Sequence, residues 1–250
     1  LLFGSTGEII TEKSGNLNLG IPGIMYVGGI SGIIGGYLYE PSTENPVPIL
    51  CILISFFSCV LGSVLLSLIY SFLTVSLRAN QNVTGLALTT FGVGIGNFFG
   101  GSLLNFFGES GSISLIETGK AYKAYLPIAD KTGIFGQTFL SFGFLAYLAV
   151  IIALICSFVL NRTRVGLNLR AVGENPATAD AAGINVTLYK YLSTCIGGML
   201  AGLGGLYFVM EYTGGTWVNN GFGDRGWLAI ALVIFARWRP LSAIWGSMLF

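Results

Sequence analysis

The sequence predicts an all-α protein, a polytopic transmembrane helical bundle with a broken or re-entrant element and a short cytoplasmic helix. Hydrophobic residues make up 53% of the 250 positions and charged residues only 9%, against roughly 25% charged in soluble domains. Long apolar runs with few charges recur along the chain, and a helix needs about 20 mostly apolar residues to cross a bilayer. We therefore interpret residues 1–250 as a single transmembrane domain.

Five apolar runs are long enough to cross the membrane, and the first contains Pro22. None has the basic start and short apolar stretch of a cleavable signal peptide. The chain begins without Met and stops inside an apolar run, so we expect it to be a piece of a longer protein, truncated at both ends. The predicted spans lie near residues 17–39, 47–77, 83–107, 137–160 and 188–210.

Positive charge predicts the orientation of these spans. The polar segment 161–190 carries Arg162, Arg164 and Arg170, and cytoplasmic loops carry an excess of Lys and Arg. We therefore expect this segment to be cytoplasmic. Alternation through the spans then gives two further inner segments, 1–16 and 78–82, and two outer segments, 40–46 and 108–136.

The last part of the chain does not contain a full apolar span. Its apolar piece, residues 227–236, covers only about 15 Å at helical rise, half of the hydrocarbon thickness. The return across the membrane must therefore include the Gly-, Asn- and Trp-rich stretch before it, which predicts a broken or re-entrant element over residues 212–236. Irregular backbone at membrane depth occurs only where it is buried in protein or lines a watery cavity. Pro240 is expected to begin a further helix, 240–250.

Glycine is about twice as frequent as in average proteins, with 37 residues. Many glycines lie four positions apart, which places them on one helix face and lets neighbouring backbones approach. This pattern indicates close helix packing, and sliding surfaces in a protein that changes shape are an alternative that the sequence leaves open. The repeated pairs are Gly28 and Gly32, Gly92 with Gly96 and Gly100, and Gly198 and Gly202.

The residues that are missing exclude several functional classes. The chain has no His, and its four cysteines lie in apolar runs without CxxC spacing, so we expect no metal on this chain and no catalytic triad. A net charge of +1 gives no basic field, so we expect no nucleic-acid partner. No GxxxxGK[ST] string occurs, so any nucleotide hydrolysis must take place on another chain.

The inner segment 161–190 contains the signals of a short surface helix. Asn175 before Pro176 suits a helix start and Gly183 suits its end. The helix is rich in Ala and has few bulky side chains, so it can sit in a groove on another protein. A loop helix lying at the lipid headgroups is the alternative, although the large apolar residues of interfacial helices are lacking.

The string RAVGENPATADAAGINV, residues 170–186, resembles the cytoplasmic coupling segment of permease subunits of bacterial ABC importers. The branch it resembles moves ribose, other simple sugars, nucleosides and branched-chain amino acids. The strings EIITEKSGNLNLGIPGIMYVGG (8–29), MLAGLGGLY (199–207) and DRGWLAIALVIFARWRPL (224–241) are similar to further parts of that branch, and most like its nucleoside and simple-sugar group. The family's terminal regions are missing, and residues 91–107 match no motif of it.

The resemblance implies an ATP-driven importer assembled from several chains. Two ABC ATPase subunits would bind ATP and Mg²⁺, a second permease subunit would be identical or homologous, and an extracytoplasmic substrate-binding protein would deliver a nucleoside or simple sugar. The inner helix would transmit movement of the ATPases to the membrane helices. The residues implied in this ATPase coupling are Arg170, Gly173, Glu174, Asn175, Pro176, Ala179, Asp180, Ala182 and Gly183.

For the substrate pathway we select polar and aromatic residues within or beside apolar runs, because intramembrane polar groups usually face a bundle interior or a cavity. Two purely structural alternatives remain open. In one, Asn97 bonds a neighbouring helix, and in the other Asp224 pairs with Arg225 at the outer interface. The selected residues are Asn16, Asn18, Asn97, Trp217, Asn219, Phe222, Asp224 and Arg225.

Two other classes of protein compete with an ATP-driven permease. An ion-coupled secondary transporter of a small polar solute would also have broken helices, but it would use several intramembrane carboxylates or a His, and this chain offers few. An intramembrane enzyme would need a nucleophile and a base at one depth, and no such pair is recognisable. We therefore expect a transport subunit of the cytoplasmic membrane rather than an enzyme.

Overall fold

The computed structural model describes residues 1–43, 45–106, 113–124 and 141–250. In these ranges every regular element is helical, and two helices end in a π-helical turn. This confirms the predicted all-α class. The elements are α1 (Leu2–Lys13), α2 (Ile21–Tyr39), α3 (Pro48–Ser71) with η1 (Phe72–Ser76), α4 (Gln81–Phe106), α5 (Ile116–Lys123), α7 (Phe144–Arg162), α8 (Arg164–Glu174), α9 (Pro176–Ala181), α10 (Val186–Tyr207) with η3 (Phe208–Tyr212), α11 (Arg225–Phe235) and α12 (Pro240–Leu249).

The five predicted spans all correspond to helices that are long and apolar enough to cross a membrane. Their ends differ from the predicted ends by a few residues. The first helix begins at Ile21 rather than at residue 17, and Pro22 stands in its first turn, where a missing N–H breaks no helical hydrogen bond. The fourth begins at Phe144; residues 137–140 of its predicted start, and most of the predicted outer segment 108–136, lie outside the described residues.

Two of the spans form the centre of the bundle. In their most apolar windows α2 is 78% and α10 is 72% buried, whereas α3, α4 and α7 are 28%, 33% and 28% buried. The exposed faces of these outer helices carry large apolar side chains such as Phe57, Leu61 and Phe158, which suit contact with lipid. The protein is therefore a multi-pass membrane protein with a protein-facing centre.

The predicted inner segment 1–16 instead forms α1, a helix inside the bundle whose residues from Phe3 to Thr11 are all buried. A Cβ at Gly7 would lie 2.2 Å from the carbonyl oxygen of Gly197 in α10, so the two backbones touch. The polar composition of this segment gives no sign of its burial in the sequence. In the structure the hydroxyl groups of Ser5 and Thr11 donate to carbonyl oxygens of the same helix, whereas the Oγ1 of Thr6 has no partner among the described residues. The Oγ1 of Thr11 donates to the carbonyl oxygen of Gly7 at 3.1 Å.

The spaced glycines lie where neighbouring helices touch, so the predicted close helix packing is confirmed. A Cβ at Gly28 in α2 would lie 2.4 Å from the Cα of Gly202 in α10, and one at Gly202 would lie 2.4 Å from the Cβ of Ser63 in α3. Likewise, a Cβ at Gly92 in α4 would lie 2.4 Å from the carbonyl oxygen of Gly23. Small residues thus give the close approach that stabilises helix pairs in lipid.

The predicted broken element is confirmed. η3 ends at Tyr212, a non-helical loop of residues 213–224 follows, and α11 has only 11 residues, about 16 Å of helix. The loop contains left-handed backbone at Asn220, where φ is 55°. Pro240 begins α12 as the sequence predicts.

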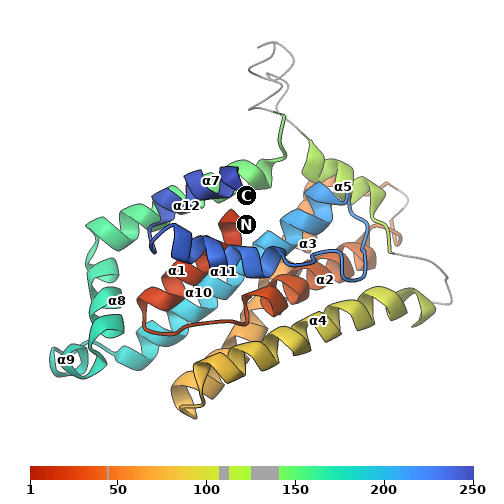
Figure 1. The fold of residues 1–250 in the computed structure, drawn as a ribbon. Helices are drawn as coiled ribbons and strands as arrows, with labels where there is room; N and C mark the ends of the chain where they lie inside the picture. The colour runs from red at the N-terminus through yellow and green to blue at the C-terminus, as the bar shows by residue number, and fades with distance from the viewer. Residues whose placement is uncertain (44, 107–112, 125–140) are drawn as a thin grey trace.

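Figure 1 shows α8 and α9 at one end of the bundle and α5 at the opposite end. The helix α10 connects these ends, because it starts just after α9 and its η3 extension packs against α5. α10 and η3 together have 27 residues, or about 40 Å of helix. The α8–α9 segment and the α5 region therefore lie on opposite sides of a bilayer that this bundle crosses.

Candidate functional site

The coupling segment consists of two helices, α8 and α9, which meet at Asn175. The Oδ1 of Asn175 accepts a hydrogen bond from the backbone N of Thr178 at 3.1 Å, and Pro176 occupies the first turn of α9. Gly183 follows the helix with a φ of +82°, a conformation that glycine adopts readily. The predicted start and stop of α9 are confirmed, whereas the sequence did not lead us to expect α8.

Most of α9 faces away from the rest of the chain. Ala179 is 3% exposed and holds the helix down, whereas the other predicted coupling residues of this turn are exposed. Gly173 lies against the preceding chain, since a Cβ there would be 2.3 Å from the carbonyl oxygen of Lys13. The exposed members are Glu174, Asn175, Pro176, Asp180, Ala182 and Gly183. The segment therefore exposes small and polar side chains, while Ala179 and Gly173 pack it against the rest of the chain.

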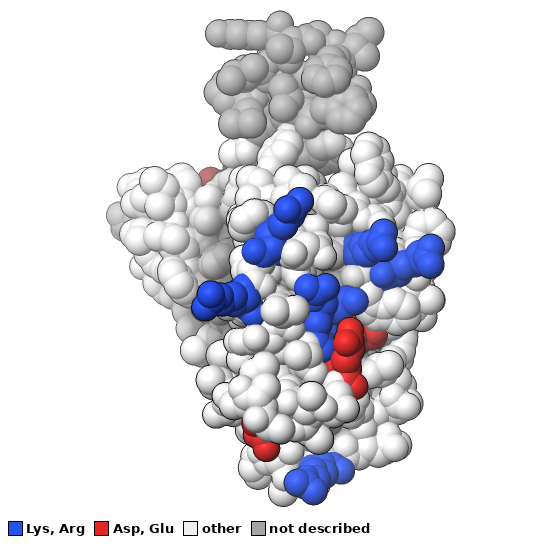
Figure 2. Space-filling model, turned by 90° about the vertical axis from the view of Figure 1, so that its left-hand side faces the viewer, with Lys and Arg blue, Asp and Glu red and all other residues white. Residues whose placement is uncertain are grey.

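A hollow of about 300 Å³ lies beside α8. The indole Nε1 of Trp238 donates to the carboxylate of Glu12 within it. Figure 2 shows Lys and Arg side chains spread over this end of the molecule, with Asp and Glu side chains at a few separate places among them. The hollow is lined by Glu12, Lys13, Arg170, Gly173, Glu174 and Trp238.

At the opposite side of the bundle, the loop 213–224 lies against α4. The indole of Trp217 fills the space above Gly100, where a Cβ would be 1.9 Å from its Nε1. Trp217 and Phe222 are each 2% exposed, and the ring centroids of Phe222 and Tyr26 are 4.5 Å apart. These two predicted pathway residues are thus buried between the loop and the helices α2 and α4, where they hold the loop in place.

Arg225 and Asp224 do not pair with each other. The guanidinium of Arg225 lies 4.9 Å from the ring centroid of Phe208 and 5.1 Å from that of Tyr212, and it donates to the carbonyl oxygens of Gly221 and Phe222. In the described part of the chain the ion pair formed is Lys120 with Glu117. The outer-interface pair considered as an alternative is therefore absent, and Asp224 is exposed.

The predicted pathway residue Asn97 bonds the loop rather than a neighbouring helix. Its Nδ2 donates to Oδ1 of Asn220 at 2.8 Å, and its Oδ1 accepts from the backbone N of Asn220 at 3.0 Å. Asn219 accepts from the Trp217 indole at 2.9 Å. Asn97, Asn219 and Asn220 therefore form a line of amides along the contact between α4 and the loop.

Asn16 and Asn18 are buried in the connection between α1 and α2. Asn16 Nδ2 donates to Thr194 Oγ1 at 3.2 Å, and the backbone N of Asn18 donates to Oε1 of the fully buried Glu8 at 2.7 Å. The Oδ1 of Asn18 accepts from the backbone N of Gly20 at 2.9 Å, while its buried Nδ2 has no hydrogen-bond partner among the described residues. The structure does not bring Asn16 and Asn18 together with Asn97 and the loop 213–224.

The sequence of residues 1–250 matches the family described as the permease component of the branched-chain amino acid transport system. The chain belongs to this permease family. One relative is the nucleoside ABC transporter permease protein NupC of Lactococcus lactis subsp. cremoris, which is 33% identical over the whole chain and 76% of its own length. Another is the putative glucose ABC transporter permease protein TsgC13 of Haloferax volcanii, which is 34% identical over the whole chain and 71% of its own length.

The guanosine ABC transporter permease protein NupQ of Bacillus subtilis is 28% identical over the whole chain and 76% of its own length. No solved structure matches. The permease is thus a membrane-spanning transport subunit and not an enzyme. Among the described residues, no three His, Cys, Asp or Glu side chains are grouped to hold a metal ion.

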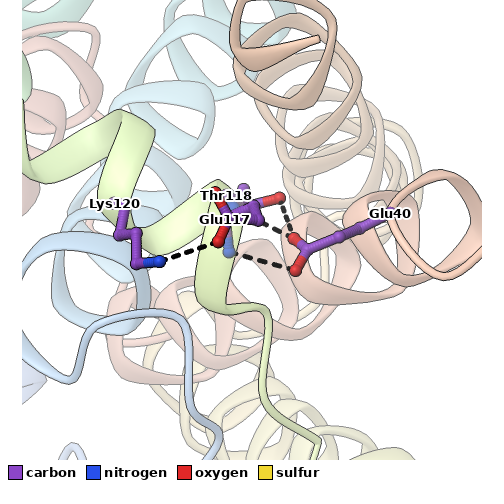
Figure 3. Close-up of polar contacts among 4 residues, drawn as sticks. All are labelled: Glu40, Glu117, Thr118 and Lys120. Atoms are coloured by element: carbon purple, nitrogen blue, oxygen red, sulfur yellow. Dashed lines mark hydrogen bonds and ion pairs between the residues drawn. The ribbon is translucent and has the colours of Figure 1, made fainter. Parts of the chain in front are cut away.

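One feature of the permease had no signal in the sequence. Glu40, at the end of α2, caps the N-terminus of α5: its Oε1 accepts from the backbone N of Glu117 at 3.1 Å, and its Oε2 accepts from the backbone N and Oγ1 of Thr118 at 3.0 and 2.6 Å (Figure 3). A carboxylate favours a helix N-terminus because it meets unpaired N–H groups and the positive end of the dipole. The partners are 77 and 78 positions apart, so local spacing cannot reveal the cap.

Proposed function

We propose that this permease forms the membrane pathway of an ATP-driven importer for a nucleoside or simple sugar. One observation carries the proposal: a permease-family chain has an exposed, capped α8–α9 segment at a basic end of the bundle, opposite the broken element. The names of the relatives, a nucleoside, a guanosine and a putative glucose ABC transporter permease, support the solute class.

Two ABC ATPase subunits are the proposed partners of α8 and α9, and they carry the ATP and Mg²⁺. The Ala-rich α9 fits a groove because it has little bulk, while Glu174 and Asp180 supply polar contacts. A second permease subunit completes the pathway. An extracytoplasmic substrate-binding protein delivers the solute at the opposite end, near α5 and the loop 213–224.

The helices act as rigid levers in this mechanism. Interfaces packed without gaps move between discrete arrangements rather than deforming continuously. α8 contacts α1 and α10, and the close contact of Gly173 with Lys13 passes a displacement of α8 directly to α1. Since α10 continues to η3 beside the loop 213–224, movement at the ATPase end reaches the broken element.

The proposed pathway uses the accessible members of the predicted set. Asn219 and Asp224 are exposed and Arg225 is half-buried, so these side chains can meet a passing solute. Asn97 is half-buried and holds Asn220 through both of its amide atoms. Asn16, Asn18, Trp217 and Phe222 are buried and hold the shape of the wall. Amides and an immobilised arginine suit the hydroxyl and carbonyl groups of an uncharged solute.

Uptake by the assembled transporter in proteoliposomes tests this function. We expect a nucleoside or simple sugar to enter only when ATP is present on the ATPase side and the binding protein on the other. An ion gradient without ATP should drive no uptake. Uptake driven by an ion gradient alone would instead establish the secondary transporter, and failure of every nucleoside and sugar to enter with ATP would exclude the proposed solute class.

A further inference from the structure

The orientation of the amides between α4 and the loop 213–224 is fixed by groups that can only donate. The indole Nε1 of Trp217 donates to Oδ1 of Asn219, and the backbone N of Asn220 donates to Oδ1 of Asn97. Neither an indole N–H nor a backbone N–H can accept a hydrogen bond. The atom of each amide that faces these donors must therefore be its oxygen.

The third amide follows from the first two. Because Oδ1 of Asn97 faces the backbone N of Asn220, its Nδ2 is the atom 2.8 Å from the Asn220 side chain, where it meets Oδ1. The Nδ2 atoms of Asn219 and Asn220 remain, and neither has a hydrogen-bond partner among the described residues. Both residues are exposed. Two neighbouring amide donors are thus held by their oxygens and presented outward.

The residues that hold these two donors in place are packed against α4. A Cβ at Gly100 would lie 1.9 Å from Nε1 of Trp217, and one at Gly101 would lie 3.3 Å from Nδ2 of Asn219. The backbone of Asn220 is left-handed, with a φ of 55°. A group that is already oriented loses less conformational freedom on binding, so this support favours recognition.

The chemistry of the pair selects the kind of ligand. Uncharged N–H donors in contact with acyl chains are costly, so this face favours water or a polar solute over lipid. Nearby, the guanidinium of Arg225 is engaged by two aromatic rings and two carbonyl oxygens. Two neutral donors fit the acceptor oxygens of a neutral solute, such as ring hydroxyl or carbonyl groups.

We propose that the Nδ2 groups of Asn219 and Asn220 bind acceptor oxygens of the transported solute and determine its selection. The inference rests on the proposed function, since it concerns the same pathway. Asn97 is a positioning residue, because its two hydrogen bonds go to Asn220. The solute class is a neutral ring compound that carries hydroxyl or carbonyl oxygens.

Isosteric exchange of the amides tests this inference in the assembled transporter. In Asn219→Asp and Asn220→Asp, one carboxylate oxygen still accepts from Trp217 or Asn97, while the second replaces the free Nδ2. We expect each exchange to raise the KM for uptake at least tenfold, with a near-normal amount of protein in the membrane. Asn82→Asp, an exposed amide at the far end of α4, is the matched control and should keep the wild-type KM.

A separate variant, Asn97→Asp, tests the positioning role of Asn97. In Asn97→Asp an oxygen replaces the Nδ2 that donates to Oδ1 of Asn220, so the Asn220 amide turns over and gives its Nδ2 to the carboxylate, while its backbone N keeps an acceptor. The outward donor of Asn220 is thereby lost. We expect the KM to rise for the same solutes, with an unchanged maximal uptake rate and an unchanged melting temperature. A fall in the melting temperature with no change in KM would assign Asn97 a structural role alone.

A second measurement uses the wild-type transporter, so it does not depend on the folding of variants. Nucleosides and sugars that each lack one hydroxyl or carbonyl oxygen compete with the transported solute, and we expect at least one deletion to weaken competition tenfold. Equal competition by all analogues, or unchanged KM values in both Asp variants, would overturn the inference while ATP-driven uptake leaves the proposed function intact. Absence of any wild-type uptake of these solutes would reject the proposed function, and this inference with it.

Discussion

At the scale of single residues, glycines in this permease allow close contacts between helices, whereas asparagines form hydrogen bonds at the ends of helices and in loops. Glycines on α2, α4 and α10 lie where another backbone or ring approaches closely, and their spacing of four made this contact predictable from the sequence. The asparagines were less predictable. Asn16 and Asn97 are both amides near apolar runs, yet Asn16 is buried and Asn97 reaches the surface, because their neighbours come from distant parts of the chain.

The glycine surface under Trp217 gives a prediction with a built-in control. In Gly100→Ala the new methyl group would overlap the Trp217 indole, and we expect a loss of about 1–3 kcal/mol in stability because the indole must move. Gly94→Ala, on the same helix, places its methyl group where no atom lies within 4 Å. Melting temperatures of the two purified variants measure the difference, and equal values would show that Trp217 is not seated on Gly100.

At the scale of elements, local signals predicted the helices that have caps and the spans that are apolar. Asn175, Pro176 and Gly183 lie within nine positions of one another, so the sequence alone indicated α9. α1 was missed because its burial comes from packing against α10, and nothing in its polar composition indicates that contact. The placement of α5 was also missed, since its cap comes from Glu40 on α2.

The Glu40 cap predicts how firmly α5 is held. In Glu40→Gln the charge is lost and one acceptor oxygen replaces two, so we expect α5 to loosen by about 1 kcal/mol, the usual contribution of an N-terminal cap. Amide hydrogen exchange at residues 116–123 should then become roughly fivefold faster.

Glu117→Gln is the control for this change, because its pair with Lys120 is exposed (Figure 3) and such surface pairs contribute little. The exchange of α5 in this variant should stay close to that of the wild type. Equal acceleration in both variants would mean that loss of charge, rather than loss of the cap, loosens the helix.

At the scale of the whole molecule, the proposed coupling segment and the proposed pathway loop lie at opposite ends of one helix, α10 (Figure 1). The charge bias indicates which end is inside, and the basic side chains gathered at the α8–α9 end agree with that bias (Figure 2). The sequence predicted the existence of both regions. It could not predict that Trp217 and Phe222 of the loop 213–224 are buried while Asn219 and Asn220 are exposed, because this depends on contacts of the loop with α2 and α4.

The orientation is open to a direct test at Thr178, an exposed residue of α9. Thr178→Cys should react with a membrane-impermeant thiol reagent only after the cells are opened, because we place α9 in the cytoplasm. The four native cysteines are buried or half-buried, and the unsubstituted protein gives their background reaction. Labelling from outside intact cells would reverse the assigned topology.

In the proposed mechanism α8 and α9 link ATP hydrolysis to solute movement, and the ratio of solute transported to ATP hydrolysed measures this link. In Glu174→Lys, a positive charge joins Lys13 and Arg170 around the hollow, and in Gly183→Leu a side chain is forced into left-handed backbone. We expect both variants to hydrolyse ATP while uptake falls at least tenfold, whereas Glu117→Lys at the opposite end keeps the wild-type ratio. An unchanged ratio in both variants would show that α8 and α9 do not couple ATP hydrolysis to transport.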